Sequence, residues 1–300
     1  MNTFITIIEF TDPACTWCWG SEPVLRKLEY YFLKNIKISY SMGGLVKDAN
    51  TFLDQKNNIG GDLKQFNQQV AKHWLEASER HGMPVQTDGF ELFTESDCST
   101  FPMNIAYKAA QFQGEEIANR FLRKMREAIA AEARQANRTE VLIELANDAG
   151  LDIPPFVSSL NDGSAEQAFK LDRDRMNQYS IRGFPGYLVK NNEGKEVLLQ
   201  GYQSYDDFVA VIKMLSENSV APAHYEVNME TIINFISCYD RIAPIELQMV
   251  FDLDKTITQN WLDSLTNSGH LSVQKVGNGA FYSLSSQSDF CGNDAGICKL

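Results

Sequence analysis

The pattern of apolar and polar positions predicts two strand-bearing segments separated by a long helical block. Residues 4–10 and 36–41 are short runs rich in β-branched and aromatic residues, as buried strands are. Residues 22–33, between these runs, carry apolar side chains at helical spacing. From about residue 60 to 180 the helical period dominates, and helices are expected over 62–81, 103–113, 115–135, 139–149, 154–160 and 164–179.

Strand patterns return at residues 186–190 and 196–199, and a helix is predicted over 204–215. Strands on both sides of a helical block predict an α/β domain over residues 1–220. The helical block, at about 60–180, is then an insertion in that domain.

The C-terminal quarter follows a plausible linker at residues 218–223 and predicts three helices and a hairpin. The helices are expected over 229–239, over 244–253 and between Asp254 and Gly269. The strands of the hairpin flank Gly277-Asn278-Gly279, a favourable turn. This order resembles a small winged helix–turn–helix domain, which we expect over residues 224–285.

The charge of this second domain does not favour DNA as a ligand. Arg241, Lys255 and Lys275 are its only lysine or arginine residues, against seven acidic residues. Lysine and arginine supply most of the affinity for DNA phosphates. We therefore expect the domain to dock a protein partner or to self-associate, and we do not expect it to bind DNA.

Length and composition narrow the class of protein further. A chain of 300 residues with 44% hydrophobic content can bury one large core or two smaller ones. Its net charge of -12 argues against nucleic acid or an anionic membrane as the main partner. No apolar run approaches the roughly 20 residues of a membrane span, and no signal peptide precedes the first strand. We expect a cytoplasmic protein, in which cysteine pairing is catalytic or redox-sensing.

The chemistry of the chain is indicated by Cys15-Thr16-Trp17-Cys18, which stands between a predicted strand and a predicted helix. A C-x-x-C motif at this junction is the arrangement of a thioredoxin-like redox site. The spacing brings both sulfurs to one face of the first helical turn, and the helix N-terminus favours a thiolate. The alternatives are two core cysteines or half of a zinc site. The four histidines show no matching spacing, so we expect no metal.

Several landmarks in one order resemble the DsbA family, and within it the FrnE-like branch of dithiol–disulfide isomerases. They are 12–20 around the cysteines, Ser99-Thr100-Phe101-Pro102, Gln113-Gly114, Gly183-Phe184-Pro185 and Gly201-Tyr202, and they span roughly residues 1–217. The resemblance implies a thioredoxin-like fold with a large helical insertion. Thr-Trp stands between the cysteines where the DsbA type has Pro-His, which leaves the direction of electron flow open.

The resemblance also implies roles for residues away from the motif. Pro185 corresponds to a cis-proline that faces the cysteines, although a trans proline at an edge strand is compatible with the sequence alone. Phe184 would then expose its backbone to substrate, with Trp17 and Trp19 as further substrate contacts. Glu9 corresponds to a buried acid that exchanges a proton with Cys18, or else it is an exposed carboxylate at a strand end.

We therefore predict a thiol–disulfide oxidoreductase or isomerase acting on protein or small-molecule disulfides, without a dissociable cofactor. Cys15 is the nucleophile and Cys18 resolves the mixed disulfide. The alternative is a redox-sensing regulator or adaptor whose winged helix binds DNA or a protein. Cys291 and Cys298, in a tail over residues 286–300, are a possible secondary redox pair or two incidental thiols on a chain end.

Overall fold

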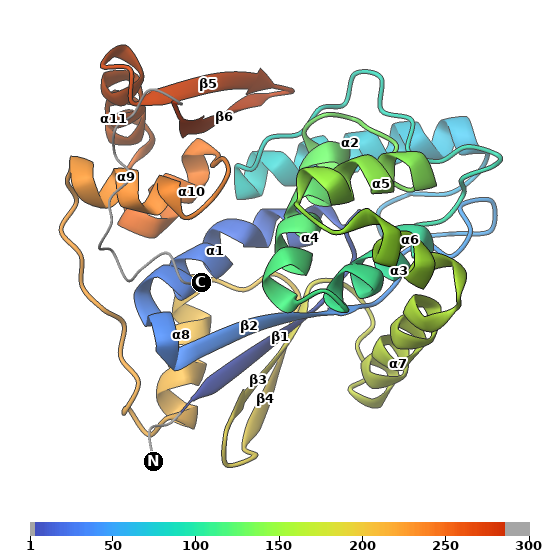
Figure 1. Cartoon of the computed structure of the whole chain (residues 1–300), viewed down its shortest axis with the longest axis horizontal. Helices are drawn as coiled ribbons and strands as arrows, with labels where there is room; N and C mark the ends of the chain where they lie inside the picture. The colour runs from blue at the N-terminus through green and yellow to red at the C-terminus, as the bar shows by residue number, and fades with distance from the viewer. Residues whose placement is uncertain (1–3, 286–300) are drawn as a thin grey trace.

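The computed structural model describes residues 4–285, and its centre is a four-stranded mixed sheet (Figure 1). The strand order is β2-β1-β3-β4, with β1 parallel to β2 and antiparallel to β3. Segments from the two ends of the predicted domain thus pair at the middle of the sheet. The strands are β1 (Ile5–Thr11), β2 (Ile36–Met42), β3 (Gly186–Asn191) and β4 (Glu196–Gln200).

Helices cover the sheet because the alternate side chains of its strands are apolar. Helices α1 (Thr16–Phe32) and α8 (Tyr205–Leu215) share one buried cluster with β1, β2 and β3. A smaller cluster on other side chains of β1 and β3 includes Phe10 and Ile181, and Met176 and Tyr179 pack against it. A short 3-10 turn, Leu33–Asn35, leads from α1 into β2.

The predicted helical insertion lies beside the sheet and builds most of a large apolar cluster, which also includes Trp19 of α1, Met42 of β2 and Phe281 near the C-terminus. Its helices are α2 (Leu63–His81), α3 (Phe101–Gln111), α4 (Glu115–Ala130), α5 (Thr139–Asp148), α6 (Ile153–Asn161) and α7 (Ser164–Gln178). The prediction of one helix over 115–135 was too long. Helix α4 ends at Ala130, and Ala133 has a positive φ of 52°, which a continuing helix does not allow.

The predicted order of three helices and a hairpin after residue 224 is found. The elements are α9 (Met229–Ser237), α10 (Pro244–Phe251), α11 (Lys255–Asn267), β5 (Leu271–Val276) and β6 (Gly279–Leu284). They pack on α1, where Tyr30 is almost fully buried against Phe235 and Phe251. The segment before α9 is also held against α1, because the Ala223 N–H donates a hydrogen bond to the carbonyl of Tyr31 at 2.7 Å.

Buried ion pairs join this C-terminal part to the rest of the chain. Glu246, on α10, is fully buried and pairs with Arg26 of α1 at 2.8 Å and with Arg123 of α4 at 2.9 Å. Arg123 also pairs with Glu22 of α1 and with Glu127. Three helices from distant parts of the sequence therefore share one set of buried charges, which we call the buried ion-pair network.

Glu246→Ala should lower the free energy of unfolding by about 3–5 kcal/mol, because it leaves Arg26 and Arg123 buried without this carboxylate. Urea denaturation measures the change. Glu226→Ala, at an exposed position before α9, is the matched control, with an expected change below about 0.5 kcal/mol. Equal stability of the two variants would show that the network does not hold α10.

Candidate functional site

The cysteine pair lies where β1 ends and α1 begins. Cys15 is the N-cap of α1, and its sulfur accepts a hydrogen bond from the Cys18 N–H at 3.4 Å. Cys15 is 6% exposed and Cys18 is fully buried, so only the first cysteine reaches the surface. This is the order of access that a nucleophile and a resolving cysteine require.

The buried carboxylate of Asp12 fixes the turn before the cysteines. It accepts hydrogen bonds from the Ala14 and Leu45 N–H groups and from the side chains of Thr100 and Asn104, at 2.7–2.8 Å. The landmark before the cysteines and the one near residue 100 thus meet in space. Their shared role is to hold the loop that carries Cys15.

The segment before β3 closes the other side of the site. The peptide bond between Phe184 and Pro185 is cis, and the Cys15 thiol lies 3.6 Å from the Phe184 carbonyl oxygen, to which it donates. The Phe184 ring rests on Gly43, where a Cβ would lie 1.9 Å from the ring. The glycine after β2 therefore makes room for Phe184 beside the cysteine.

Glu9 lies under the cysteine pair and is fully buried, which excludes the alternative of an exposed carboxylate. Burial raises its pKa from 4.5 to about 7, although Arg126, 3.2 Å away, opposes the rise. Burial and the neighbouring Cys15 and Glu9 also raise the pKa of the Cys18 thiol well above its usual value. The structure therefore brings a carboxyl group with a pKa of about 7 next to the thiol of Cys18.

The structure corrects one of the two tryptophan assignments. Trp19 is 1% exposed; its indole N–H donates to the Pro84 carbonyl at 2.9 Å and its ring packs on Phe281. It is a core residue and cannot contact a docked substrate, because the fold of α1 turns it away from the surface. Trp17 is only half-buried and lies between the rings of His81 and Tyr202, each at 6.0 Å.

Two side chains at the site, His81 and Arg126, were missed from the sequence, and Tyr202 was named only as part of a landmark. His81 and Arg126 come from helices far from the motif, so no local pattern links them to the cysteines. The one available signal was Gly20, directly after the motif, where a Cβ would lie 2.5 Å from the His81 ring. A glycine inside a helix indicates a close approach of this kind.

A cavity of about 1030 Å³ opens beside Cys15, between α2, the loop after β2 and the segment that ends at Phe184. Its lining combines apolar and charged side chains, among them Trp17, Val46, Phe66, Trp74, Arg80 and Arg182. Within residues 4–285, no three His, Cys, Asp or Glu side chains gather as metal ligands, and no helix is long and apolar enough to cross a membrane. Cys291 and Cys298 lie outside the described residues.

A mixed sheet with a cysteine pair at its first strand-to-helix junction and a cis-proline opposite defines a thioredoxin-like protein. The sequence family described as Thioredoxin matches residues 9–210, and the chain belongs to this family.

Relatives with a named function are similar along nearly the whole chain. The ClpXP adapter protein SpxH of Halalkalibacterium halodurans is 26% identical over 282 residues, which cover 93% of this chain and 88% of that protein. SpxH of Bacillus subtilis is 25% identical over 294 residues, covering 95% of this chain and 91% of that protein.

Solved structures share a smaller part of the chain. A protein from Nitrosomonas europaea described as a disulfide isomerase has a TM-score of 0.59 at 20% identity. The cytosolic disulfide reductase DsbM of Pseudomonas aeruginosa has a TM-score of 0.55 at 21% identity. Each match covers 70% of this chain and 97% of the other. These matches show that the fold is thioredoxin-like with a helical insertion, as in DsbA-type oxidoreductases.

The raised pKa of Glu9 predicts a pH dependence of stability. Its folded pKa of about 7 exceeds the ordinary 4.5, so its contribution is complete below pH 4.5 and is lost as the pH rises through about 7. Glu9→Gln has no such titration. Between pH 4.5 and about 7, its free energy of unfolding should therefore fall less than that of the wild type, and the two falls should differ by up to about 3 kcal/mol.

Urea unfolding of the reduced protein at a series of pH values measures both slopes. Glu226→Gln, at an exposed position, is the control and should keep the wild-type slope. A wild-type slope in Glu9→Gln would contradict the assignment of this titration to Glu9.

Proposed function

We propose that this chain is an adapter that brings protein substrates to ClpXP. The observation that carries the proposal is the extent of the similarities. Two SpxH relatives match 93–95% of this chain and others match 71–87% of it, whereas two oxidoreductase structures match 70% of it and 97% of themselves. The C-terminal part is therefore shared with at least two of the adapters and is absent from those two structures.

The structure of the C-terminal part supports a role in protein contacts. It is joined to α1 and α4 by the buried ion-pair network, so it has a fixed position relative to the cavity beside Cys15. Two surfaces with a fixed relative position suit an adapter, which must hold a substrate and a partner at once. The acidic composition of residues 224–285 still argues against DNA, and a protein partner fits it better.

A second function, thiol–disulfide exchange, is favoured by the contact between Cys15 and the Phe184 carbonyl. The Cys15 thiolate would attack a substrate disulfide, breaking its S–S bond and releasing one substrate thiolate. Cys18 would lose its proton to Glu9 and attack the mixed disulfide, which releases the second thiolate and leaves a Cys15–Cys18 disulfide. Two electrons pass from the pair to the substrate, and the step needs no dissociable cofactor.

Further assignments follow from these proposals. We propose a cytoplasmic location. It is consistent with a role beside ClpXP and with the similarity of the fold to DsbM, a disulfide reductase described as cytosolic. The boundaries 1–220 and 224–285, the winged-helix assignment, the FrnE-like branch and the Cys291–Cys298 pair stay predictions. Trp17 and Phe184 remain the proposed substrate contacts.

The adapter proposal predicts a set of proteins whose degradation depends on both this chain and ClpXP. In host cells, loss of the gene should lengthen the half-lives of proteins that are also stabilised by loss of ClpP. With purified ClpXP, adding the chain should accelerate degradation of those same proteins. The double variant Cys15→Ser, Cys18→Ser should still do so, because an adapter works by docking. If no protein shows both dependences, the chain is not a ClpXP adapter.

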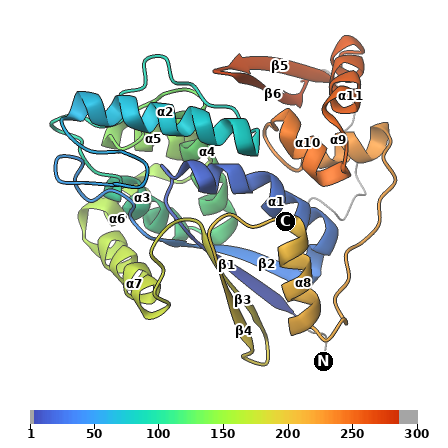
Figure 2. The ribbon, with the colours of Figure 1, turned by 180° about the vertical axis from the view of Figure 1, so that it is seen from behind.

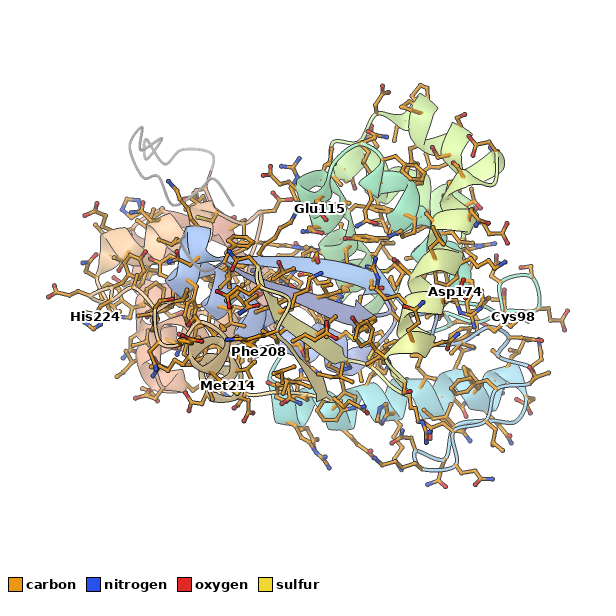
Figure 3. The ribbon with its side chains drawn as sticks, turned by 90° about the horizontal axis from the view of Figure 1, so that it is seen from below. Cys98, Glu115, Asp174, Phe208, Met214 and His224 are labelled. Carbon is orange, nitrogen blue, oxygen red and sulfur yellow. The ribbon has the colours of Figure 1, made fainter. Side chains whose placement is uncertain are left out.

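The exchange proposal predicts different effects of the two cysteines. Cys15→Ser should abolish turnover on a protein disulfide, whereas Cys18→Ser should accumulate mixed disulfides visible on non-reducing gels. Cys98→Ser is the matched control, since Cys98 lies on the loop before α3 (Figure 3) and should leave turnover unchanged. Undiminished turnover in Cys15→Ser would refute the exchange function and leave the adapter proposal standing.

A further inference from the structure

The tip of the β5–β6 hairpin is docked on the loop after α2, as both ribbon views show (Figures 1 and 2). The Asn278 N–H donates to the Val85 carbonyl at 3.0 Å, and the Val85 N–H donates to the Asn278 side-chain oxygen at 2.8 Å. The Asn278 side-chain NH₂ group donates to the Ser78 hydroxyl at 3.0 Å. The contact is close, since a Cβ on Gly277 would lie 2.0 Å from the Val85 oxygen.

A continuous series of hydrogen bonds leads from this tip to the cysteine motif. The Ser78 hydroxyl, which accepts from Asn278, donates to the Met83 carbonyl at 2.8 Å. The Met83 N–H donates to Nδ1 of His81 at 3.1 Å, and Nε2 of His81 lies 3.4 Å from the hydroxyl of Thr16. Thr16 stands between the two cysteines.

These contacts fix the chemical state of His81. Because Nδ1 accepts from a backbone N–H, the proton of the neutral ring is on Nε2, which then donates to Thr16. Burial lowers the pKa of His81 to about 4, so the ring is neutral at physiological pH. The ring is 5% exposed and lies on Gly20, with Trp17 at its edge. It therefore acts by position and not by charge.

The same assembly also holds the residue after the motif. Trp19 donates to the Pro84 carbonyl and packs on Phe281 of β6. Residues inside the motif and directly after it are thus fixed by the end of α2, the loop after it and the C-terminal hairpin.

We propose that His81 is a positioning residue for the Cys15–Cys18 pair, and that the docked hairpin tip holds His81 in place. The C-terminal part thereby acts on the cysteine site from a distance. The first turn of α1 must adjust when Cys15 and Cys18 change between dithiol and disulfide, and the Thr16–His81 contact restrains that turn. A partner that lifts the hairpin would change the dithiol–disulfide equilibrium, and by linkage the redox state would change the affinity of that partner by the same factor.

The inference rests on the proposed redox chemistry of the pair. It is tested on the full chain by two readouts. One is the equilibrium constant of the Cys15–Cys18 dithiol–disulfide couple with glutathione, and the other is the rate at which iodoacetamide alkylates Cys15. His81→Asn should keep the acceptor for Met83 and lose the donor to Thr16, whereas His81→Gln should restore the donor. We expect a change of about threefold or more in both readouts for His81→Asn, with recovery in His81→Gln. His224→Gln, at an exposed site in the segment before α9, is the control (Figure 3).

The hairpin is tested by Asn278→Ala, which removes both side-chain hydrogen bonds, against Val273→Ala on the exposed side of β5. Asn278→Ala should shift both readouts in the same direction as His81→Asn, and Val273→Ala should leave them unchanged. Unshifted readouts in His81→Asn, or a shift in His81→Asn without one in Asn278→Ala, would overturn the proposal. Failure of disulfide turnover in the wild type is a separate result, because alkylation reports on the Cys15 thiol whether or not exchange occurs.

Discussion

A single buried guanidinium, that of Arg126, connects the chemistry of the site to the architecture around it. It has no exposed surface and lies between two carboxylates, Glu9 of β1 and Glu22 of α1. Burial raises the pKa of Glu22, but Arg126, Arg123 and Arg26 outweigh burial and bring it down to about 2. Glu9 has Arg126 as its main cationic partner, and its pKa stays at about 7. One arginine thus contacts an acid whose pKa is lowered and an acid whose pKa is raised.

Arg123, close to Arg126 on α4, extends the buried ion pairs from α1 to the C-terminal part. It lies one helical turn before Arg126 and pairs with Glu22 and with Glu246 of α10. A buried charge without a partner costs several kcal/mol, so these elements can pack only in arrangements that keep the pairs together. The network therefore fixes how the insertion and the C-terminal helices meet α1, and through α1 how the cysteines are presented.

Local patterns in the sequence were sufficient for much of the fold. The strands, most helices and the strand–cysteine–helix junction follow from periodicity and turn residues, which act over a few positions. The position of the cysteine pair was predicted because the spacing of Cys15 and Cys18 is itself a chemical signal, whereas the burial of Glu9 was expected only from the resemblance to the DsbA family. Trp19 was misassigned because its neighbours in the sequence do not show that Pro84 and Phe281 enclose it. His81 and Arg126 were missed for the same reason, since their partners come from distant elements.

The aromatic contact around Tyr30 has a consequence for how the chain can be divided. Tyr30 is 1% exposed, and Tyr225, Phe235 and Phe251 of the C-terminal part cover it at ring distances of 4.7–5.6 Å. A shortened chain that ended after α8 would present an uncovered aromatic surface along α1, together with Arg26 and Arg123 stripped of Glu246. Surfaces of this kind bind other proteins indiscriminately or aggregate. The part that ends at α8 and the C-terminal part that covers α1 are therefore expected to stay soluble together, and neither is expected to stay soluble when it is produced alone.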